Sequence, residues 1–288
     1  MRKYLLLAAI LIIANFNYCQ QEYKGLFWKV YGNNLSDTSY LYGTMHTQDE
    51  RVFQFKDGVL DAFNSSKIYA MELNVDSINH AALLQELIMD SSASLKTLLS
   101  DSNYNLVDQY FRDSLAISLF LFEKISPIYT AQLIAMKDLG KQQKDALDLF
   151  FHNEAKKQGK KIIGLEKMSE QINAINSIPY KNQAEELVNA VNKAKNSKQN
   201  ELETLIAFYV QGDLDTLLAL TTQNNTNNEI NTIIETVFIL KRNQNMAERC
   251  EKYLKENSTF IAIGAAHLPG ENGVIELLRK KGYKVMAN

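Results

Sequence analysis

Two of the four histidines in this chain end the same four-residue pattern, and each pattern follows a short apolar run. The first is Gly43-Thr44-Met45-His46, after Tyr40-Leu41-Tyr42, and the second is Gly264-Ala265-Ala266-His267, after Phe260-Ile261-Ala262-Ile263. A short apolar run that ends at glycine is typical of a buried strand. The glycine of each pattern is expected to let the backbone turn sharply. We therefore predict two strands of one sheet that each carry an imidazole just beyond their end.

Four further segments have the composition of strands. Each is a short run rich in apolar residues, and Gly32-Asn33-Asn34 is a turn signal after the first of them. The order strand, helix, strand between Ser39 and Leu73, with the helix expected at 56–64, predicts a parallel βαβ unit. The four segments are 26–31, 68–73, 162–166 and 283–286.

Helical periodicity fills the sequence between these strands. The chain has only 3 Pro and 12 Gly among 288 residues, which favours long helices over a many-turned all-β fold. We predict an α/β fold with a mixed central sheet, built from N- and C-terminal strands, and with helical insertions packed around it. The insertions are expected at about residues 76–158 and 180–256 of a single domain that spans 21–288.

Residues 1–20 have the features of a secretory signal peptide. Arg2 and Lys3 precede an uninterrupted apolar run, Leu5 to Ala14, which is too short to span a bilayer comfortably. The segment predicts an exported protein of the periplasm or cell envelope, with secretion as an alternative. Cys19 would be the site of a lipid anchor, but bulky Tyr18 stands where such sites have a small residue, which argues against lipidation.

Net charge and cysteine content narrow the classes of function. The formal net charge is −2 and no long basic run is present, so nucleic acid is not an expected partner. No segment after residue 20 approaches membrane-spanning length, so we expect no transmembrane domain in the mature chain. Cys250 lies in a helix-like stretch, where we expect it to be a small buried residue. The oligomeric state is left open by the sequence.

Four expected strands end in polar side chains suited to chemistry: His46, Glu72, Glu166 and His267. In α/β sheets, ligands bind beyond the carboxyl ends of the strands, so these side chains could meet at one site. Two imidazoles and one carboxylate suffice to hold a catalytic divalent metal ion with an open position for water. We therefore predict metal ligation by His46, Glu72 and His267, which would provide a nucleophile without a catalytic Ser or Cys.

The remaining candidates lie in helical segments. An arginine such as Arg242, aimed into a cleft, can hold a carboxylate or stabilise an oxyanion. Asn243 is its neighbour, and adjacent helix positions point about 100° apart, so Arg242 is the stronger candidate of the two. His80 and His152 have neither a glycine nor a strand beside them, and we expect both on the surface.

These residues resemble the motifs of the TraB/GumN family, which includes the Tiki-type proteases. The likeness covers nearly all of the mature chain, in the family's order and with similar spacing. Two departures weaken an assignment of roles to nearby acids: Ala146 stands where the family often has Gly before Asp148, and Lys167 follows Glu166 where Thr is usual. The matching segments are Leu41 to His46, Met71 to Leu73, Ile163 to Glu166 with Glu170-Gln171, Arg242 to Ala247, and Ile263 to Gly270.

The resemblance implies an α/β fold in which the paired Gly-x-x-His motifs face one cleft. It carries His46, Glu72, Arg242, Asn243 and His267 over as the site. Tiki-type members are regarded as metal-dependent peptidases. Within the wider superfamily, erythromycin esterases use a histidine base without a metal, and another branch comprises haem-binding lipoproteins.

Three hypotheses follow from the residues and the resemblance together. In the first, the chain is an exported metal-dependent hydrolase, a peptidase, in which His46, Glu72 and His267 hold Mn, Co or Zn. Its substrate would be a peptide or a small molecule, with Arg242 and Asn243 at a substrate carboxylate or the tetrahedral oxyanion. The second is a metal-free esterase with His46 as general base. The third is a non-catalytic envelope protein that binds haem or another ligand.

Overall fold

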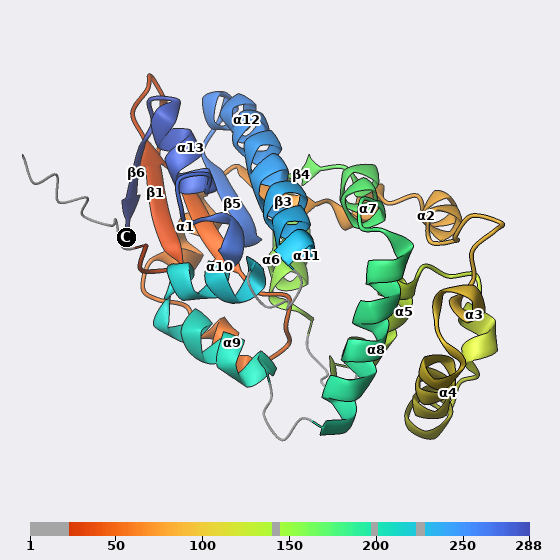
Figure 1. The fold of residues 1–288 in the computed structure, drawn as a ribbon. Coiled ribbons are helices and arrows are strands. Elements are labelled where there is room, and N and C mark those ends of the chain that lie inside the picture. The colour runs from red at the N-terminus through yellow and green to blue at the C-terminus, as the bar shows by residue number, and fades with distance from the viewer. Residues whose placement is uncertain (1–22, 140–144, 197–200, 223–227) are drawn as a thin grey trace, which may run out of the picture.

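The computed structural model describes residues 23–139, 145–196, 201–222 and 228–288 (Figure 1). Its centre is a six-stranded sheet with the strand order β4-β3-β5-β2-β1-β6. Strands β2, β5, β3 and β4 run parallel, whereas β1 is antiparallel to both β2 and β6. The predicted α/β class and mixed sheet are therefore confirmed. The strands are β1 (Phe27–Tyr31), β2 (Ser39–Thr44), β3 (Ile68–Leu73), β4 (Lys161–Glu166), β5 (Thr259–Gly264) and β6 (Lys284–Ala287).

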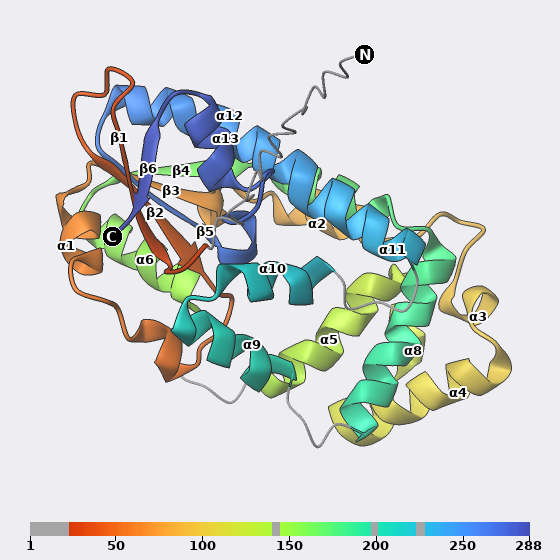
Figure 2. The ribbon, with the colours of Figure 1, turned by 60° about the vertical axis from the view of Figure 1, so that its left-hand side comes forward.

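Helices cover both faces of the sheet and extend beyond one of its ends. Helices α12 and α13 lie on one face and α1 and α6 on the other, as Figure 2 shows. The α-helices are α1 (Val59–Ser65), α2 (His80–Glu86), α3 (Leu95–Leu98), α4 (Asp101–Tyr110), α5 (Pro127–Leu139), α6 (Leu147–Lys157), α7 (Met168–Asn176), α8 (Tyr180–Asn196), α9 (Glu201–Gln211), α10 (Leu214–Thr222), α11 (Asn228–Ile233), α12 (Lys241–Glu256) and α13 (Val274–Lys280). Shorter helical segments are η1 (Glu50–Phe53), η2 (Val75–Ser77), η3 (Phe111–Leu115), η4 (Leu119–Phe122), η5 (Ile234–Leu240) and η6 (Ala265–His267).

Strand β5 lies between the two strands of the predicted βαβ unit. Strands β2 and β3 are parallel and joined through α1, as expected, but neither pairs with the other. Ala262 of β5 pairs with Tyr42 on one side and with Met71 on the other. Thr44 pairs with Gly264, so the first and second Gly-x-x-His motifs leave the sheet side by side. Strand β5 therefore brings the second motif into the sheet beside the first.

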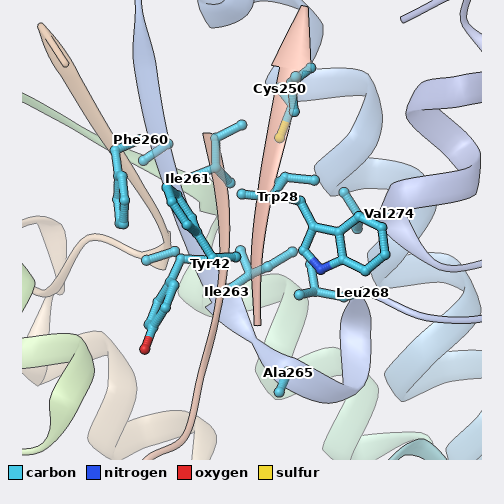
Figure 3. Close-up of a cluster of buried hydrophobic side chains, with 14 of the residues drawn as sticks. Trp28, Tyr42, Cys250, Phe260, Ile261, Ile263, Ala265, Leu268 and Val274 are labelled. Atoms are coloured by element: carbon cyan, nitrogen blue, oxygen red, sulfur yellow. The ribbon is translucent and has the colours of Figure 1, made fainter. Parts of the chain in front are cut away.

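The core is formed by strand residues that alternate between the two faces. Tyr42 and Phe260 point towards α6, where the ring of Phe151 lies 5.6 Å and 5.3 Å from theirs. Figure 3 shows Cys250 and Val274 on the other side of the sheet, next to Trp28 and Leu268. Cys250 is fully buried, as expected, and burial raises the pKa of its thiol to about 12.

A second apolar core lies in the helices beyond the sheet. It joins α3, α4, α5 and α8 through the buried side chains of Leu95, Val107, Ile134 and Leu187. Gln183 fixes α8 to the start of α5: its side chain accepts bonds from the Ser126 hydroxyl and the Ile128 N–H. These helices fall within the ranges predicted for insertions, while the assignment of one domain to residues 21–288 stays a prediction. In the described part of the chain, no helix has both the length and the apolar character needed to cross a membrane.

One expectation about the histidines is wrong. His152 of α6 is only 3% exposed, and its Nε2 lies 3.2 Å from Oδ2 of Asp76, just after β3. The helical pattern around His152 gives no sign of this pairing because Asp76 is distant in sequence. The side chain of His80 lies outside the described residues, as does the predicted signal segment 1–20 with Cys19.

Candidate active site

A pocket of about 590 Å³ lies at the carboxyl ends of the parallel strands. Its lining includes His46 after β2, Glu72 at the end of β3, His267 after β5 and Arg242 at the start of α12. Asn243 is fully buried and does not line the pocket, because it lies behind the ring of His267. Four of the five predicted site residues thus share one cavity, and the fifth supports one of them.

The glycines of the two motifs serve close packing, and the expected turn after each strand does not depend on a left-handed glycine. Neither Gly43 nor Gly264 adopts a positive φ angle. A Cβ atom on Gly43 would lie 3.0 Å from Cδ1 of Leu268, and one on Gly264 would lie 3.0 Å from Oε1 of Glu72. The absence of a side chain at Gly264 therefore lets the Glu72 carboxylate approach the end of β5.

His267 is held in one orientation by Asn243. Its Nδ1 lies 2.6 Å from Oδ1 of Asn243, whose amide donates from Nδ2 to the carbonyl of Asn272 at 2.8 Å. Because Nδ2 of Asn243 is the donor to that carbonyl, Oδ1 is the acceptor and His267 carries its proton on Nδ1. Burial lowers the pKa of His267, although Glu72 opposes this. Nε2 of His267 is then unprotonated, with a free lone pair, and lies 3.8 Å from Oε1 of Glu72.

His46 has a corresponding partner in Asp148 of α6. Its Nδ1 lies 2.7 Å from Oδ2 of Asp148, while Oδ1 of Asp148 accepts a hydrogen bond from the hydroxyl of Thr44. The side chain of His46 is 69% exposed, whereas that of His267 is 7% exposed. The carboxylate of Asp148 raises the pKa of His46 to about 9, so at neutral pH the ring must release its Nε2 proton before that nitrogen can bind a metal ion. Both imidazoles therefore have Nδ1 against an oxygen acceptor, which leaves Nε2 for a ligand.

A buried charge cluster holds Glu72. Its Oε2 accepts from Nη2 of Arg242 at 2.7 Å, and its Oε1 accepts from the backbone N–H of Gly264 at 2.6 Å. Arg242 also binds Glu166 through Nη2 at 2.6 Å and Nε at 2.8 Å. Burial alone would raise the pKa of Glu72, but His267, Arg242, His46 and the Gly264 N–H together lower it to about 2. Glu72 is therefore a carboxylate at neutral pH.

The residues after β4 support its end. Nε2 of Gln171 donates to Oε2 of Glu166 at 3.1 Å. Arg249 of α12 donates to the carbonyl of Leu165 at 2.7 Å and pairs with Glu170 at 2.6 Å. The matching motif Glu170-Gln171 thus has a structural explanation, because it fixes the acid that binds Arg242.

Asp148 and Glu166 are site residues that sequence reasoning left without a role. Glu166 had one signal, its position at the end of a predicted strand. Asp148 had none apart from the family pattern, since it lies on a helix 104 residues from its hydrogen-bond partner Thr44. Each contacts one of the predicted site residues, Asp148 at His46 and Glu166 at Arg242.

The chemistry of the donors suits a divalent metal ion. Two Nε2 atoms and a carboxylate are the ligands that Zn²⁺ and similar ions take in catalytic sites. The 3.8 Å between Nε2 of His267 and Oε1 of Glu72 is longer than a hydrogen bond, and Gly264 leaves open the space that a Cβ would fill. Within the described ranges, no group of three or more His, Cys, Asp or Glu already forms a metal-binding cluster.

The fold and the site define a class: α/β proteins with paired Gly-x-x-His motifs at the carboxyl ends of parallel strands. Comparison with protein-family models places the chain within that class. The model of the TraB/PrgY/gumN family matches residues 26–287. The chain therefore belongs to the TraB/PrgY/gumN family, as its motifs predict.

Curated relatives cover most of the chain at low identity. Metalloprotease TIKI2 from Danio rerio is 25% identical over 92% of the chain and 61% of its own length. Metalloprotease TIKI1 from Homo sapiens is 23% identical over 92% of the chain and 62% of its own length. An uncharacterized protein from Treponema pallidum (strain Nichols) is 24% identical over 89% of the chain and 80% of its own length. The chain thus spans less than two thirds of these two metalloproteases, and no solved structure matches it significantly.

Proposed function

We propose that this protein is an exported metal-dependent hydrolase that cleaves peptides. The observation that carries the proposal is the pairing of two imidazoles, each with Nδ1 against an oxygen acceptor, at one pocket with the buried carboxylate of Glu72. The names of the TIKI relatives, which are metalloproteases, support the same reaction class. The predicted signal peptide at residues 1–20 supports export.

His46, His267 and Glu72 would hold the ion, with Mn, Co and Zn as the candidates. A bound ion of this kind supplies Lewis acidity and an activated water. Asp148 and Asn243 keep the two rings oriented, which is the usual function of partners behind metal-bound histidines. Glu72 stays ionised because Arg242 and the Gly264 N–H bind its two oxygens.

Arg242 has a positioning role in this proposal. The sequence predicts that it binds a substrate carboxylate or an oxyanion, but its Nε and Nη2 are bound to Glu166 and Glu72. We therefore assign these two groups to the orientation of Glu72. Nη1 donates no hydrogen bond to the described residues and is the part of Arg242 that would meet a substrate oxygen.

Metal-dependent peptide hydrolysis tests this function. The mature chain is stripped with a chelator, reloaded with Mn²⁺, Co²⁺ or Zn²⁺, and assayed on a mixture of internally quenched peptides. We expect hydrolysis only after reloading, with losses of about 100-fold or more in His46→Ala, His267→Ala and Glu72→Gln. Glu256→Gln, at an exposed ion pair with Lys161, is the control and should keep full activity. Full activity in the histidine variants would refute the proposal.

The contact between His46 and Asp148 favours a second candidate, a metal-free hydrolase. A histidine against a carboxylate at 2.7 Å has the arrangement of a general base and its orienting acid, and the raised pKa of His46 means that it would act as a base only as the pH approaches 9. This candidate predicts ester or peptide hydrolysis that survives chelation and falls in Asp148→Asn. A visible absorption band of the purified protein without any turnover would instead support the ligand-binding hypothesis.

A further inference from the structure

The pocket has two chemically different halves. The strand ends supply the polar half described above, and the helices beyond the sheet supply an apolar wall. That wall includes Ile178 before α8, Leu217 of α10, and Ile234, Phe238 and Ile239 of η5. We propose that this wall binds a bulky apolar side chain of the substrate next to the bond that is cleaved. This proposal rests on the function proposed above.

The size and exposure of the wall fit this role. A pocket of about 590 Å³ lies within the range of roughly 300–1,000 Å³ typical of ligand sites, which are mostly apolar with a few polar groups. Ile178, Leu217 and Ile239 are 6–7% exposed, while Ile234 and Phe238 are half-buried. Covering the half-buried pair with an apolar substrate group would remove more apolar surface from water.

Segment η5 connects the wall to the charged cluster. It is a π-helix that continues directly into α12, and its residues Phe238 and Ile239 line the same pocket as Arg242. A π-helix has a wider turn than an α-helix, and such turns are often found at functional sites. Phe238 of the apolar wall is thus about one helical turn from Arg242, whose guanidinium holds Glu72. A side chain bound against Phe238 would place its peptide bond near the imidazoles.

Charge in the pocket selects against an acidic substrate side chain. The described residues that line the pocket include no lysine, and the two cationic side chains among them already face carboxylates: Asp148 for His46, and Glu72 and Glu166 for Arg242. Glu186 on the helical side adds a negative charge, and among the described residues its carboxylate accepts a long hydrogen bond of 3.5 Å from Nδ2 of Asn189. An acidic group on the wall would therefore lose water without gaining a counter-ion.

Peptide selectivity and binding test the inference together. Internally quenched peptides carry Leu, Phe, Ala, Asp or Lys at each position beside the cleaved bond. We expect kcat/KM for Leu or Phe at one position to exceed that for Ala by about tenfold or more, with Asp lowest. Phe238→Ala should abolish most of this preference, mainly through KM, and Phe238→Leu should retain it. Phe120→Ala, at a side chain that is 74% exposed and does not line the pocket, should behave as the unmodified protein.

A binding assay separates failure of this inference from failure of the proposed function. Fluorescein-labelled hexapeptides that differ only in one Leu or Asp are titrated against the metal-free Glu72→Gln protein. Tighter binding of the Leu peptide, lost in Phe238→Ala, supports the wall even if no peptide is ever hydrolysed. Hydrolysis with equal rates for all side chains, or a preference for Asp or Lys, overturns the inference and leaves the hydrolase proposal intact.

Discussion

Asn243 and His267 are joined by a 2.6 Å hydrogen bond between the amide Oδ1 and the ring Nδ1, and both residues are buried. The bond connects α12 to the turn after β5. Because Asn243 also donates to the carbonyl of Asn272, its amide has only one orientation that satisfies both partners. Helix α12 thereby sets the tautomer of His267 and directs Nε2 towards Glu72.

The first prediction concerns this support. Asn243→Ala removes the acceptor of the His267 proton, so the ring loses its fixed tautomer. We expect metal affinity to fall by about 10–100-fold, as for other partners of metal-bound histidines. Competition between the protein and a chromophoric chelator measures the affinity. Asn245→Ala, two positions along the same helix, is the control, and an equal loss in both variants would remove Asn243 from its assigned role.

The second prediction concerns Glu166, whose side chain is 1% exposed. Glu166→Gln removes a buried charge that Arg242 binds through two nitrogens. We expect a loss of about 1.5–3 kcal/mol in the free energy of unfolding, the range for hydrogen bonds to charged groups. Urea unfolding checks this value. Glu256→Gln, at its exposed pair with Lys161, should change stability little, and equal effects of the two substitutions would contradict the account.

The third prediction concerns space beside Glu72. Gly264→Ala places a Cβ 3.0 Å from Oε1 of Glu72 and should displace the carboxylate, with loss of metal binding. Gly43→Ala places its Cβ 3.0 Å from Leu268 instead, so it should cost about 1–3 kcal/mol of stability as an overpacked site while metal binding persists. Thermal unfolding and metal analysis of both variants separate the two effects. Retained metal in a folded Gly264→Ala protein would show that Glu72 is not a ligand.

The fourth prediction concerns stability in acid. Arg249 lowers the pKa of Glu170 from an ordinary 4.5 to about 2. A lowered pKa means that the pair stabilises the fold above pH 4.5 and that this contribution is lost as the pH falls from about 4.5 to 2. Glu170→Gln should therefore destabilise the protein at pH 7, by about 1 kcal/mol for a partly exposed pair, and make no difference near pH 2. Urea unfolding at several pH values measures this, and a pH-independent difference would argue against an ionic contribution.

Much of the fold could be predicted because the spacing of apolar residues along the chain indicates which segments are buried strands and helices. Strands β3 and β5 consist mainly of apolar residues, so their positions follow from composition. The place of β5 between β2 and β3 is a different matter, because it depends on which strand edges pair. Only the resemblance and the paired motifs indicated that the two ends meet.

The supporting residues could not be predicted from local pattern. Asp148 and His152 both lie on α6, and each bonds to a residue on a distant segment, Thr44 or Asp76. A carboxylate or imidazole on a helix has the same local pattern whether it faces water or a partner. The role of Gly264 was missed for a related reason, since its restriction comes from Glu72 and not from its own backbone angle.

Cobalt binding is the most direct test of the claim that both Gly-x-x-His histidines act on one ion. Metal-free protein is titrated with Co²⁺ while the visible ligand-field spectrum and the stoichiometry are recorded. The account predicts one ion per chain with a low-symmetry spectrum that His46→Ala and His267→Ala each alter or abolish. His152→Gln, at a histidine outside the pocket, should leave the spectrum unchanged. An unchanged spectrum in either motif variant, or no binding by the unmodified protein, would contradict the account.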